Sequence, residues 1–505
     1  MSMELEPTMM APKSDRPETI SSPESQPAPE SGERKKLPEG YVAEKKRREE
    51  IKHLTTNALE LDQEFVLIPG GEVSNRIEIL ETRETLSTGA ELSRDVIGEA
   101  GINAITRRTY EGDPKRIAYV KPQSGETAFR YDADTDRVLK ISKVFNEKTQ
   151  QVDTQEEVYA DGKNGDAEDQ NLVAYFHTRM AEMPKMRERI AEAYGITPEE
   201  VPLSQTECSP RMGIDVRKSA IREYTTSQID NLLNFGVVPQ TVLRGEKGRT
   251  GAATEVNSVQ EAFLAQNPDV PIRSIDPELY AELKTQGKNH PGAKSFMRVA
   301  TMHWLRKALD GHNDNVLYDE STHQFKAIDN GLSQGLSQAV EKTDPKTGAT
   351  KKIIEPLDPL RSVPLEIVQE HLDWELDEEA LDEIKRVYES TVDYLKTREK
   401  IAHTRATREA EGTSFDAGII DQTALEELQK KQGGKEIKYI TKLFRLQYEN
   451  ERIAEKEGVE FFKNLEYLIT HKRPPQMNIG DKGGDLFPLT RVLYRAPQPQ
   501  SDAAA

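Results

Sequence analysis

Hydrophobic and polar positions alternate with two different periods along this chain, and the period changes near its middle. Residues 65–144 carry short apolar runs, EFVLIP, RIAYVKP and AFRYD, punctuated by Gly, Pro and Asp as β-strands usually are. Beyond Leu283 the apolar residues recur at helical spacing. The run GAKSFMRVATMHWLRKAL carries one apolar stripe: Phe296, Val299, Ala300, Trp304, Leu305 and Leu309. The pattern predicts a β-rich first half and a mainly helical second half.

Helix and strand signals are mixed between these halves. Residues 170–194 and 219–233 have helical spacing, and the run FGVVPQTVL after them returns to strand composition. Further helices are expected in residues 363–396 and 436–469. Breaks in helical segments are expected at three glycines: Gly433, Gly434 and Gly458.

Composition then suggests the domain boundaries. Residues 1–40 hold seven of the 28 prolines and no aromatic residue, so burial cannot offset the entropy of ordering them, and we expect a disordered tail. The charge pattern of residues 41–64 predicts a charged helix around KKRREE. The remaining parts are a first lobe with a helical insertion at residues 65–258, a second lobe at 259–400, a helical extension at 401–471 and a flexible tail at 472–505.

Charge and cysteine content narrow the class of protein. The 88 acidic residues exceed the 69 basic ones, and this net charge of -19 argues against binding to nucleic acid or to anionic membranes. Cys208 is the only cysteine, which excludes an internal disulfide and a cysteine-based zinc site. No apolar run approaches the roughly 20 residues of a membrane span, and the N-terminus lacks the core of a secretory signal. We therefore expect a cytoplasmic protein with no transmembrane segment.

The segment DGHNDNVLYDESTHQFKAIDNG, residues 310–331, carries the candidate chemistry. Strand composition at residues 316–318 and 324–328, on either side of a turn-like stretch, predicts a β-hairpin. Antiparallel pairing brings the two outer ends of a hairpin together. Asn315 and Asp329 are therefore expected side by side.

An amide oxygen and a carboxylate at one end of a hairpin form a hard-oxygen site suited to magnesium, which keeps its other positions for water and phosphate oxygens. Asp310 can reach the same space from the preceding loop. A carboxylate there can orient an acceptor hydroxyl and take its proton while a phosphoryl group transfers. The order of Asp310, Asn315 and Asp329 is thus the kinase arrangement, although each fragment alone also suits an ordinary polar loop or turn.

Two motifs in this segment resemble those of a known family. The catalytic and metal-binding loops of the phosphatidylinositol 3/4-kinase-like superfamily, most closely those of type II phosphatidylinositol 4-kinases, are similar to DGHNDNVL and AIDNGLSQG. Upstream, the family's lysine-bearing strand resembles RIAYVKP, its helix and next strand resemble AIREYTTSQIDNLLNFGVVPQTVL, and its hinge resembles EVNSVQEAF. Downstream, DPLRSVPLEI is also similar.

The resemblance covers residues 98–374 and implies a fold. The expected fold class is α+β and bilobal, like that of protein kinases, with an antiparallel β-rich N-lobe and a mainly helical C-lobe. A hinge is expected near residues 255–258, and ATP would bind between the lobes.

The resemblance also implies a role for each matched residue, with ATP and Mg²⁺ as cofactors. Lys121 would hold the α and β phosphates, and Glu223 would pair with Lys121. Asp310 would be the catalytic base, while Asn315 and Asp329 would bind the metal. In GEAGIN, three residues match the loop that covers the phosphates: Gly98, Gly101 and Asn103.

Two departures from the family affect these expectations. Gly311 stands where the family commonly has Arg after the catalytic Asp, so a cation that could organise the loop is missing, and His312 is a candidate to compensate by moving a proton or stabilising the transferring group. Type II lipid kinases also carry a cysteine-rich palmitoylated segment. Here Cys208 is the only thiol, and a single acyl chain would anchor weakly. This difference lowers the expectation of a lipid substrate.

Three functional hypotheses stay open at the level of sequence. The first is a kinase that transfers the γ-phosphate of ATP to a hydroxyl of a protein, or of an inositol lipid or small molecule. The second is a catalytically silent pseudokinase that acts as a nucleotide-binding interaction scaffold. The third is a helical protein whose match to kinase motifs is accidental, and such a protein would gain no thermal stability from ATP and magnesium.

Overall fold

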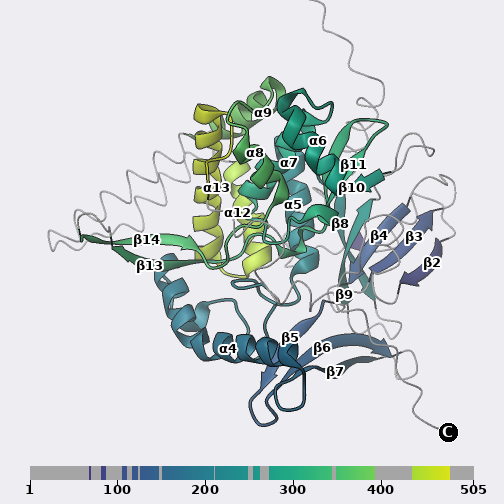
Figure 1. The fold of residues 1–505 in the computed structure, drawn as a ribbon, viewed down its shortest axis with the longest axis vertical. Helices are drawn as coiled ribbons and strands as arrows, with labels where there is room; N and C mark the ends of the chain where they lie inside the picture. The colour runs from purple at the N-terminus through teal and green to yellow at the C-terminus, as the bar shows by residue number, and fades with distance from the viewer. Residues whose placement is uncertain are drawn as a thin grey trace, which may run out of the picture. The chain divides into compact units, whose positions relative to one another are not determined.

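A mixed α+β architecture, with sheets made almost entirely of antiparallel strands, carries the chain (Figure 1). The computed structural model describes residues 68–69, 81–86, 105–110, 117–122, 126–146, 151–209, 211–247, 254–261, 272–343, 348–392 and 435–477. The α+β class and the antiparallel sheets expected from the sequence are confirmed. The expectations for residues 1–40, 41–64 and 401–434 lie outside the described residues, and the domain boundaries stay predictions.

The largest sheet has the strand order β1-β8-β9-β4-β3-β2. Its strands are β1 (Ile68–Pro69), β2 (Glu81–Leu86), β3 (Ile105–Tyr110), β4 (Ile117–Pro122), β8 (Thr241–Lys247) and β9 (Thr254–Glu261). All neighbours pair antiparallel except β1 and β8. Helix α5 (Ser219–Leu233), whose bounds match the helical spacing of the sequence, contacts both β8 and β9.

The hinge expected near residues 255–258 falls on this sheet and stays a prediction. These residues lie inside β9, where Val256 pairs with Gly245 of β8 and Ser258 pairs with Lys121 of β4. Residues 257–260 of β9 have a partner strand on both edges, whereas Glu255 and Val256 pair with β8 alone.

A second sheet and a long helix form a unit inserted between β4 and α5. Its strands β5 (Ala128–Asp132), β6 (Arg137–Asn146) and β7 (Gln151–Asp161) are packed against α4 (Ala167–Tyr194) (Figure 1). The side chain of Asp166 caps α4 by accepting from the backbone N–H groups of Glu168 and Asp169. Phe129 and Phe176 join the sheet to the helix with ring centroids 5.4 Å apart.

The hairpin expected in the DGHNDNVLYDESTHQFKAIDNG segment is confirmed. Strands β11 (Val316–Asp319) and β12 (Gln324–Ala327) pair antiparallel, and β10 (Ile272–Ser274) adds a third strand to this sheet. Asp319 stabilises the turn, since its carboxylate accepts from the backbone and the hydroxyl of Ser321. Val316 lies opposite Ala327, so the chain enters and leaves the hairpin at one place.

Helices supply most of the core around this hairpin. They are α6 (Pro277–Gln286), α7 (Ala293–Leu305), α8 (Val363–Glu370), α9 (Glu378–Glu389), α12 (Lys435–Tyr448) and α13 (Glu451–His471), with short 3₁₀ turns η2 (Pro198–Glu200) and η3 (Gly287–Asn289). The apolar stripe of α7 is buried, and Phe296 packs on Phe325 of β12 and on Trp374. The helix expected at residues 363–396 is two helices within the described residues, because Asp377 starts α9 as a new N-cap.

The helix break expected at Gly458 is also corrected. Gly458 lies inside α13, which packs beside α12 (Figure 1). A Cβ atom at this position would lie 2.9 Å from Oγ1 of Thr441, so the glycine allows the two helices to approach closely. The break occurs instead at Glu449, which has a φ of 53°, and at Asn450, which caps α13.

A two-stranded sheet, β13 (Ser337–Thr343) and β14 (Thr350–Pro356), follows the hairpin in the sequence, and α4 contacts β13. Among the helices of the described ranges, none has both the length and the apolar character that crossing a membrane requires.

Candidate functional site

The structure brings together the two loops that carry Asp310 and Asp329. Ile328 donates its backbone N–H to the carbonyl of Asn315 at 2.9 Å, which extends the hairpin by one pair beyond Val316 and Ala327. Leu309 donates its backbone N–H to the carbonyl of Leu332 at 3.0 Å. The loop before the hairpin and the loop after it are therefore joined on both sides of the candidate site.

Asn315 is held in place by the loop that it follows. It ends the short 3₁₀ helix η4 (Asn313–Asn315), and its side-chain Nδ2 donates to the carbonyl of Asp310 at 2.7 Å. The residue is only 6% exposed. Because Nδ2 is used in this way, the amide oxygen Oδ1 is the atom with which Asn315 could bind a cation.

Asp329 occupies a turn that presses against helix α5. Its φ of 50° places it in the left-handed region, and it starts the 3₁₀ helix η5 (Asn330–Leu332). A Cβ atom at Gly331 would lie 2.1 Å from Oγ of Ser219, the first residue of α5, and 3.6 Å from Oδ1 of Asp329. Only glycine allows this close approach, so the Asp329 loop and the start of α5 are fixed against each other.

Asp310 forms an ion pair with Arg211 that no local sequence pattern predicts. Its Oδ1 accepts from Nη2 of Arg211 at 2.7 Å, and the two side chains are 12% and 6% exposed. His312, one third exposed, lies on the other side, with Nε2 3.9 Å from Oδ2 of Asp310. That distance is too long for a hydrogen bond. The Nδ1 atom of His312 accepts from the backbone N–H of Asp314 at 3.2 Å, so a neutral ring carries its proton on Nε2, the atom that faces Asp310.

Close packing explains why residue 311 is a glycine. A Cβ atom here would lie 2.7 Å from the ring of His303 and 2.9 Å from the carbonyl oxygen of Arg361. Backbone hydrogen bonds hold this contact, because Gly311 donates to that carbonyl at 2.9 Å and accepts from Val363 at 2.9 Å. The arginine that the family commonly has at this place would not fit the observed packing.

The DPLRSVPLEI segment, residues 358–367, packs against the Asp310 loop. Ser362 accepts at Oγ from the backbone N–H of Leu365, which caps α8, and its Oγ lies 2.8 Å from Nδ1 of His303. Burial lowers the pKa of His303 to about 4, so the ring is neutral and can accept the serine proton. Burial also raises the pKa of Asp358, and the nearby guanidinium groups of Arg211 and Arg361 oppose this shift.

The residues expected to contact the nucleotide are placed in part. Lys121 lies on β4 and pairs through its backbone with Ser258 of β9. Glu223 is fully buried in α5, the helix that contacts β8 and β9 of the same sheet. Gly98, Gly101 and Asn103 lie outside the described residues.

Glu126 is a second buried carboxyl near the Asp329 loop. It accepts from the backbone N–H of Ser219 at 2.8 Å, at the start of α5. Burial raises its pKa to about 7, although the nearby Arg222 guanidinium and the hydrogen bond from Ser219 oppose the shift. Asp215 adds a further negative charge in this region, and Nη2 of Arg222 donates to its carbonyl at 3.0 Å.

The donors at the hairpin end fit the chemistry of a magnesium site. One amide oxygen and one carboxylate supply hard oxygen ligands, and Mg²⁺ is commonly held by so few protein ligands together with phosphate oxygens and water. No cluster of three or more His, Cys, Asp or Glu side chains that could hold a metal occurs among the residues that the structure describes. Asn315 and Asp329 would therefore supply only part of a metal's ligands, and water or phosphate oxygens would supply the rest.

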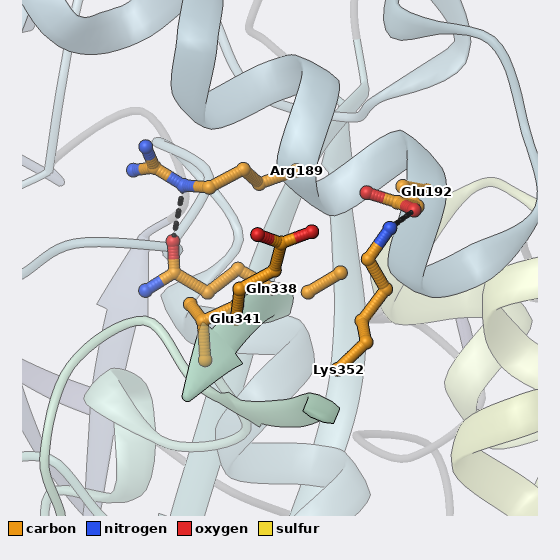
Figure 2. Close-up of a pocket in the computed structure, with 7 residues that line it drawn as sticks. Arg189, Glu192, Gln338, Glu341 and Lys352 are labelled. Carbon is orange, nitrogen blue, oxygen red and sulfur yellow. Dashed lines mark hydrogen bonds and ion pairs between the residues drawn. The ribbon is translucent and has the colours of Figure 1, made fainter. Parts of the chain in front are cut away.

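A pocket of about 340 Å³ lies between α4 and the β13–β14 sheet (Figure 2). Two pairs of its lining side chains bind each other, because Nε of Arg189 donates to Gln338 at 2.7 Å and Lys352 is ion-paired with Glu192 (Figure 2). None of the residues that the sequence singled out lines it. We do not assign it to the candidate site.

Sequence reasoning missed Arg211, Asp358 and Ser362, and it left Cys208 open. Their contacts cross long stretches of sequence, and no local spacing signals them. Cys208 is buried, burial raises the pKa of its thiol, and its backbone pairs with that of Phe129. A thiol in this position serves packing and cannot carry a lipid without local unfolding.

No protein-family model matches this chain, and no curated protein matches it. The case for a function therefore depends on the geometry above and on the motifs that carry the resemblance.

Proposed function

We propose that this chain is an ATP- and magnesium-dependent kinase that transfers the γ-phosphate to a hydroxyl group, with a protein as the favoured acceptor. One observation carries the proposal: Asp310, Asn315 and Asp329 are brought to two loops that are hydrogen-bonded to each other. An acid that can take a proton and two oxygen ligands for a metal are the parts that phosphoryl transfer asks of a protein.

A bilobal kinase-like arrangement is part of this proposal. In protein kinases the ATP-binding lysine lies on the third strand of the N-lobe sheet and pairs with a glutamate of a nearby helix. Lys121 lies on β4, which pairs with β3 and β9, and Glu223 lies on α5, which contacts β8 and β9 of the same sheet. These positions support an N-lobe that holds ATP above the Asp310 and Asp329 loops.

Each matched residue has its own role in the proposed phosphoryl transfer. Asp310 orients the acceptor hydroxyl and takes its proton as the new oxygen–phosphorus bond forms, while the bond from the γ-phosphorus to the bridging oxygen breaks and ADP leaves. Asn315 and Asp329 hold Mg²⁺, which when bound neutralises the charge of the phosphate oxygens. Lys121 holds the α and β phosphates, with Glu223 as its partner. Gly98, Gly101 and Asn103 stay candidates for phosphate binding from the sequence alone. His312, with Nε2 turned toward Asp310, moves a proton between the site and solvent.

The direct test is transfer of label from γ-labelled ATP with magnesium to the chain itself, to a lysate or to phosphatidylinositol vesicles. Asp329→Asn is the control, because it keeps the size of the side chain and removes the metal-binding charge. We expect protein labelling that falls at least 100-fold in the variant. Equal labelling by the variant would refute the proposal, and label only in the lipid fraction would move the acceptor to an inositol lipid.

The pseudokinase scaffold remains the second candidate, because Asp310 is largely shielded and already bound to Arg211. A nucleotide-binding scaffold would be stabilised by ATP and magnesium, since a ligand of the native state raises the melting temperature. It would label no acceptor. A stabilised but inactive wild-type chain would therefore favour this candidate.

A further inference from the structure

Arg211 comes from a polar stretch about a hundred residues upstream of the candidate base and meets it in a shielded place. The contact between Nη2 of Arg211 and Oδ1 of Asp310 is 2.7 Å long, and both side chains are mostly buried. Water and salt compete little for a pair in such a place, and charge-assisted hydrogen bonds are directional. The pair therefore fixes the direction of the carboxylate.

Helix α4 holds the loop that carries Arg211. Arg179 of α4 donates through Nη1 to the carbonyl of Ser209 at 2.7 Å and through Nη2 to the carbonyl of Arg211 at 2.9 Å. The same loop is tied to β5, where Cys208 and Phe129 exchange backbone hydrogen bonds of 2.8 and 2.9 Å. Arg211 is thus delivered by the unit inserted between β4 and α5.

The residue next to the base cannot supply this cation. Gly311 meets the ring of His303 and the carbonyl of Arg361 so closely that no side chain fits without a shift. Where the resembling family commonly has an arginine at this place, the present chain has a glycine and brings a guanidinium to the same carboxylate from a distant segment.

We propose that Arg211 is the positioning residue for Asp310, and that the inserted unit of β5, β6, β7 and α4 serves the active site by delivering it. This inference rests on the proposed kinase function. Arg211 acts through Asp310, so its loss should lower the rate of the chemical step and leave the binding of ATP unchanged.

The test measures kcat and the KM for ATP in the full-length chain. We expect Arg211→Ala to lower kcat about 10- to 100-fold with less than a twofold change in KM, and Arg211→Lys to recover part of the rate, since a lysine keeps the charge but loses the planar fork. Arg179→Ala should lower kcat in the same direction by a smaller factor. Each variant is assayed well below its melting temperature.

Arg187 offers a matched control on the same helix. It is buried to a similar degree and also holds a loop through backbone carbonyls, those of Pro198, Glu199 and Leu203, but it does not hold the Arg211 loop. Arg187→Ala should lose stability as Arg179→Ala does and keep the wild-type kcat. Equal losses of kcat in both variants would overturn the role of α4 in delivering Arg211.

A second readout separates positioning from general damage. In an Asp310→Asn background, Arg211→Ala should change the residual rate by less than twofold, because the group that it positions is gone. A wild-type or raised kcat in Arg211→Ala would overturn the inference while the kinase function stands. Absence of transfer by the wild-type chain would overturn the kinase function and this inference together.

Discussion

Two groups of largely buried polar and charged side chains differ in how completely they surround a central carboxylate. The Asp310 cluster consists of Arg211, Asp310, Asp358 and Arg361. The Glu457 cluster consists of Tyr194, Lys307, Gln334 and Glu457. Both join segments that are far apart in the sequence.

The Glu457 cluster is closed. Glu457 is 4% exposed and accepts from the hydroxyl of Tyr194 at 2.5 Å, from Nζ of Lys307 at 2.8 Å and from the side chain of Gln334. Arg306 lies next to it, and Nη2 of Arg306 donates to Gln447 of α12 at 3.0 Å. Burial lowers the pKa of Arg306 to about 10.

The Asp310 cluster, by contrast, reaches solvent through His312, which is one third exposed and lies beside the carboxylate. The two clusters indicate that ion pairs of the same kind can either stabilise the fold or position a carboxylate. A carboxylate surrounded by donors on every side stabilises the fold. Asp310 is ion-paired with Arg211 at one oxygen and has the partly exposed His312 beside the other, and it is the carboxylate that we propose to receive a hydroxyl.

The largest effect on stability is expected from Glu457→Gln. The change leaves the ammonium group of Lys307 in a mostly buried place without its carboxylate, and breaking a buried pair commonly costs about 3–5 kcal/mol. Urea unfolding should show a loss of this order. If the Glu457 cluster is only structural, kcat of the folded variant stays within about threefold of the wild-type value.

Glu460→Gln is the control, since Glu460 is exposed on the same helix and a surface change of this kind stays within about 0.5 kcal/mol. Gln334 follows the Asp329 loop in the sequence and donates a hydrogen bond to Glu457. The measurement of kcat therefore tests whether a change at Glu457 reaches the Asp329 loop through Gln334. A tenfold loss of kcat in a folded Glu457→Gln variant would mean that the Glu457 cluster also shapes the proposed active site.

Local features of both regions could be predicted from the sequence. The bounds of α5 follow from apolar spacing, and the β11–β12 hairpin follows from strand composition around the Asp319 turn. Because the register of a hairpin is set by its turn, the proximity of Asn315 to Asp329 could also be expected.

The clusters themselves could not be predicted, for a physical reason. Arg211 is separated from Asp310 by 99 residues, and Gln334 is separated from Glu457 by 123 residues. Side-chain pairs between distant segments leave no period in the sequence. Gly458 shows the same limit, since helical spacing cannot tell a helix break from a close contact between helices.

A pH effect of intermediate size is expected from Glu126, a buried carboxyl outside both clusters. Its pKa is about 7 in the folded chain and near 4.5 when unfolded, so the folded state binds the proton more tightly. The stability that this proton gives is complete below about pH 4.5 and is lost as the pH rises through about 7, by on the order of 3 kcal/mol.

Glu126→Gln should remove this dependence. The variant should gain stability relative to the wild type as the pH rises from 4.5 to 7, and the difference between the two unfolding free energies is the quantity to measure. The lowered pKa of His303 acts in the opposite direction, because its neutral form is lost as the pH falls, but it is common to both proteins and cancels. A constant difference across this range would mean that Glu126 is already ionised in the fold.

The smallest expected loss of stability comes from Gly311→Ala, and it tests the Asp310 cluster without touching a charge. The added methyl group would meet the ring of His303 at 2.7 Å, and such overpacking costs about 1–3 kcal/mol. The loop must shift to admit it, and Asp310 shifts with the loop. If Asp310 is the base that we propose, kcat should fall about tenfold, because small misplacements of a catalytic group are costly.

Gly458→Ala provides the matched change beside Glu457. Its methyl group would meet Oγ1 of Thr441 at 2.9 Å, so the loss of stability should be similar, but the shift would fall between α12 and α13. We expect kcat within about twofold of the wild type. If both alanine variants lose stability and only Gly311→Ala lowers kcat, the Asp310 and Glu457 clusters are functionally distinct. If kcat falls in parallel in both variants, the two clusters act as one unit through the loop between Asp329 and Gln334.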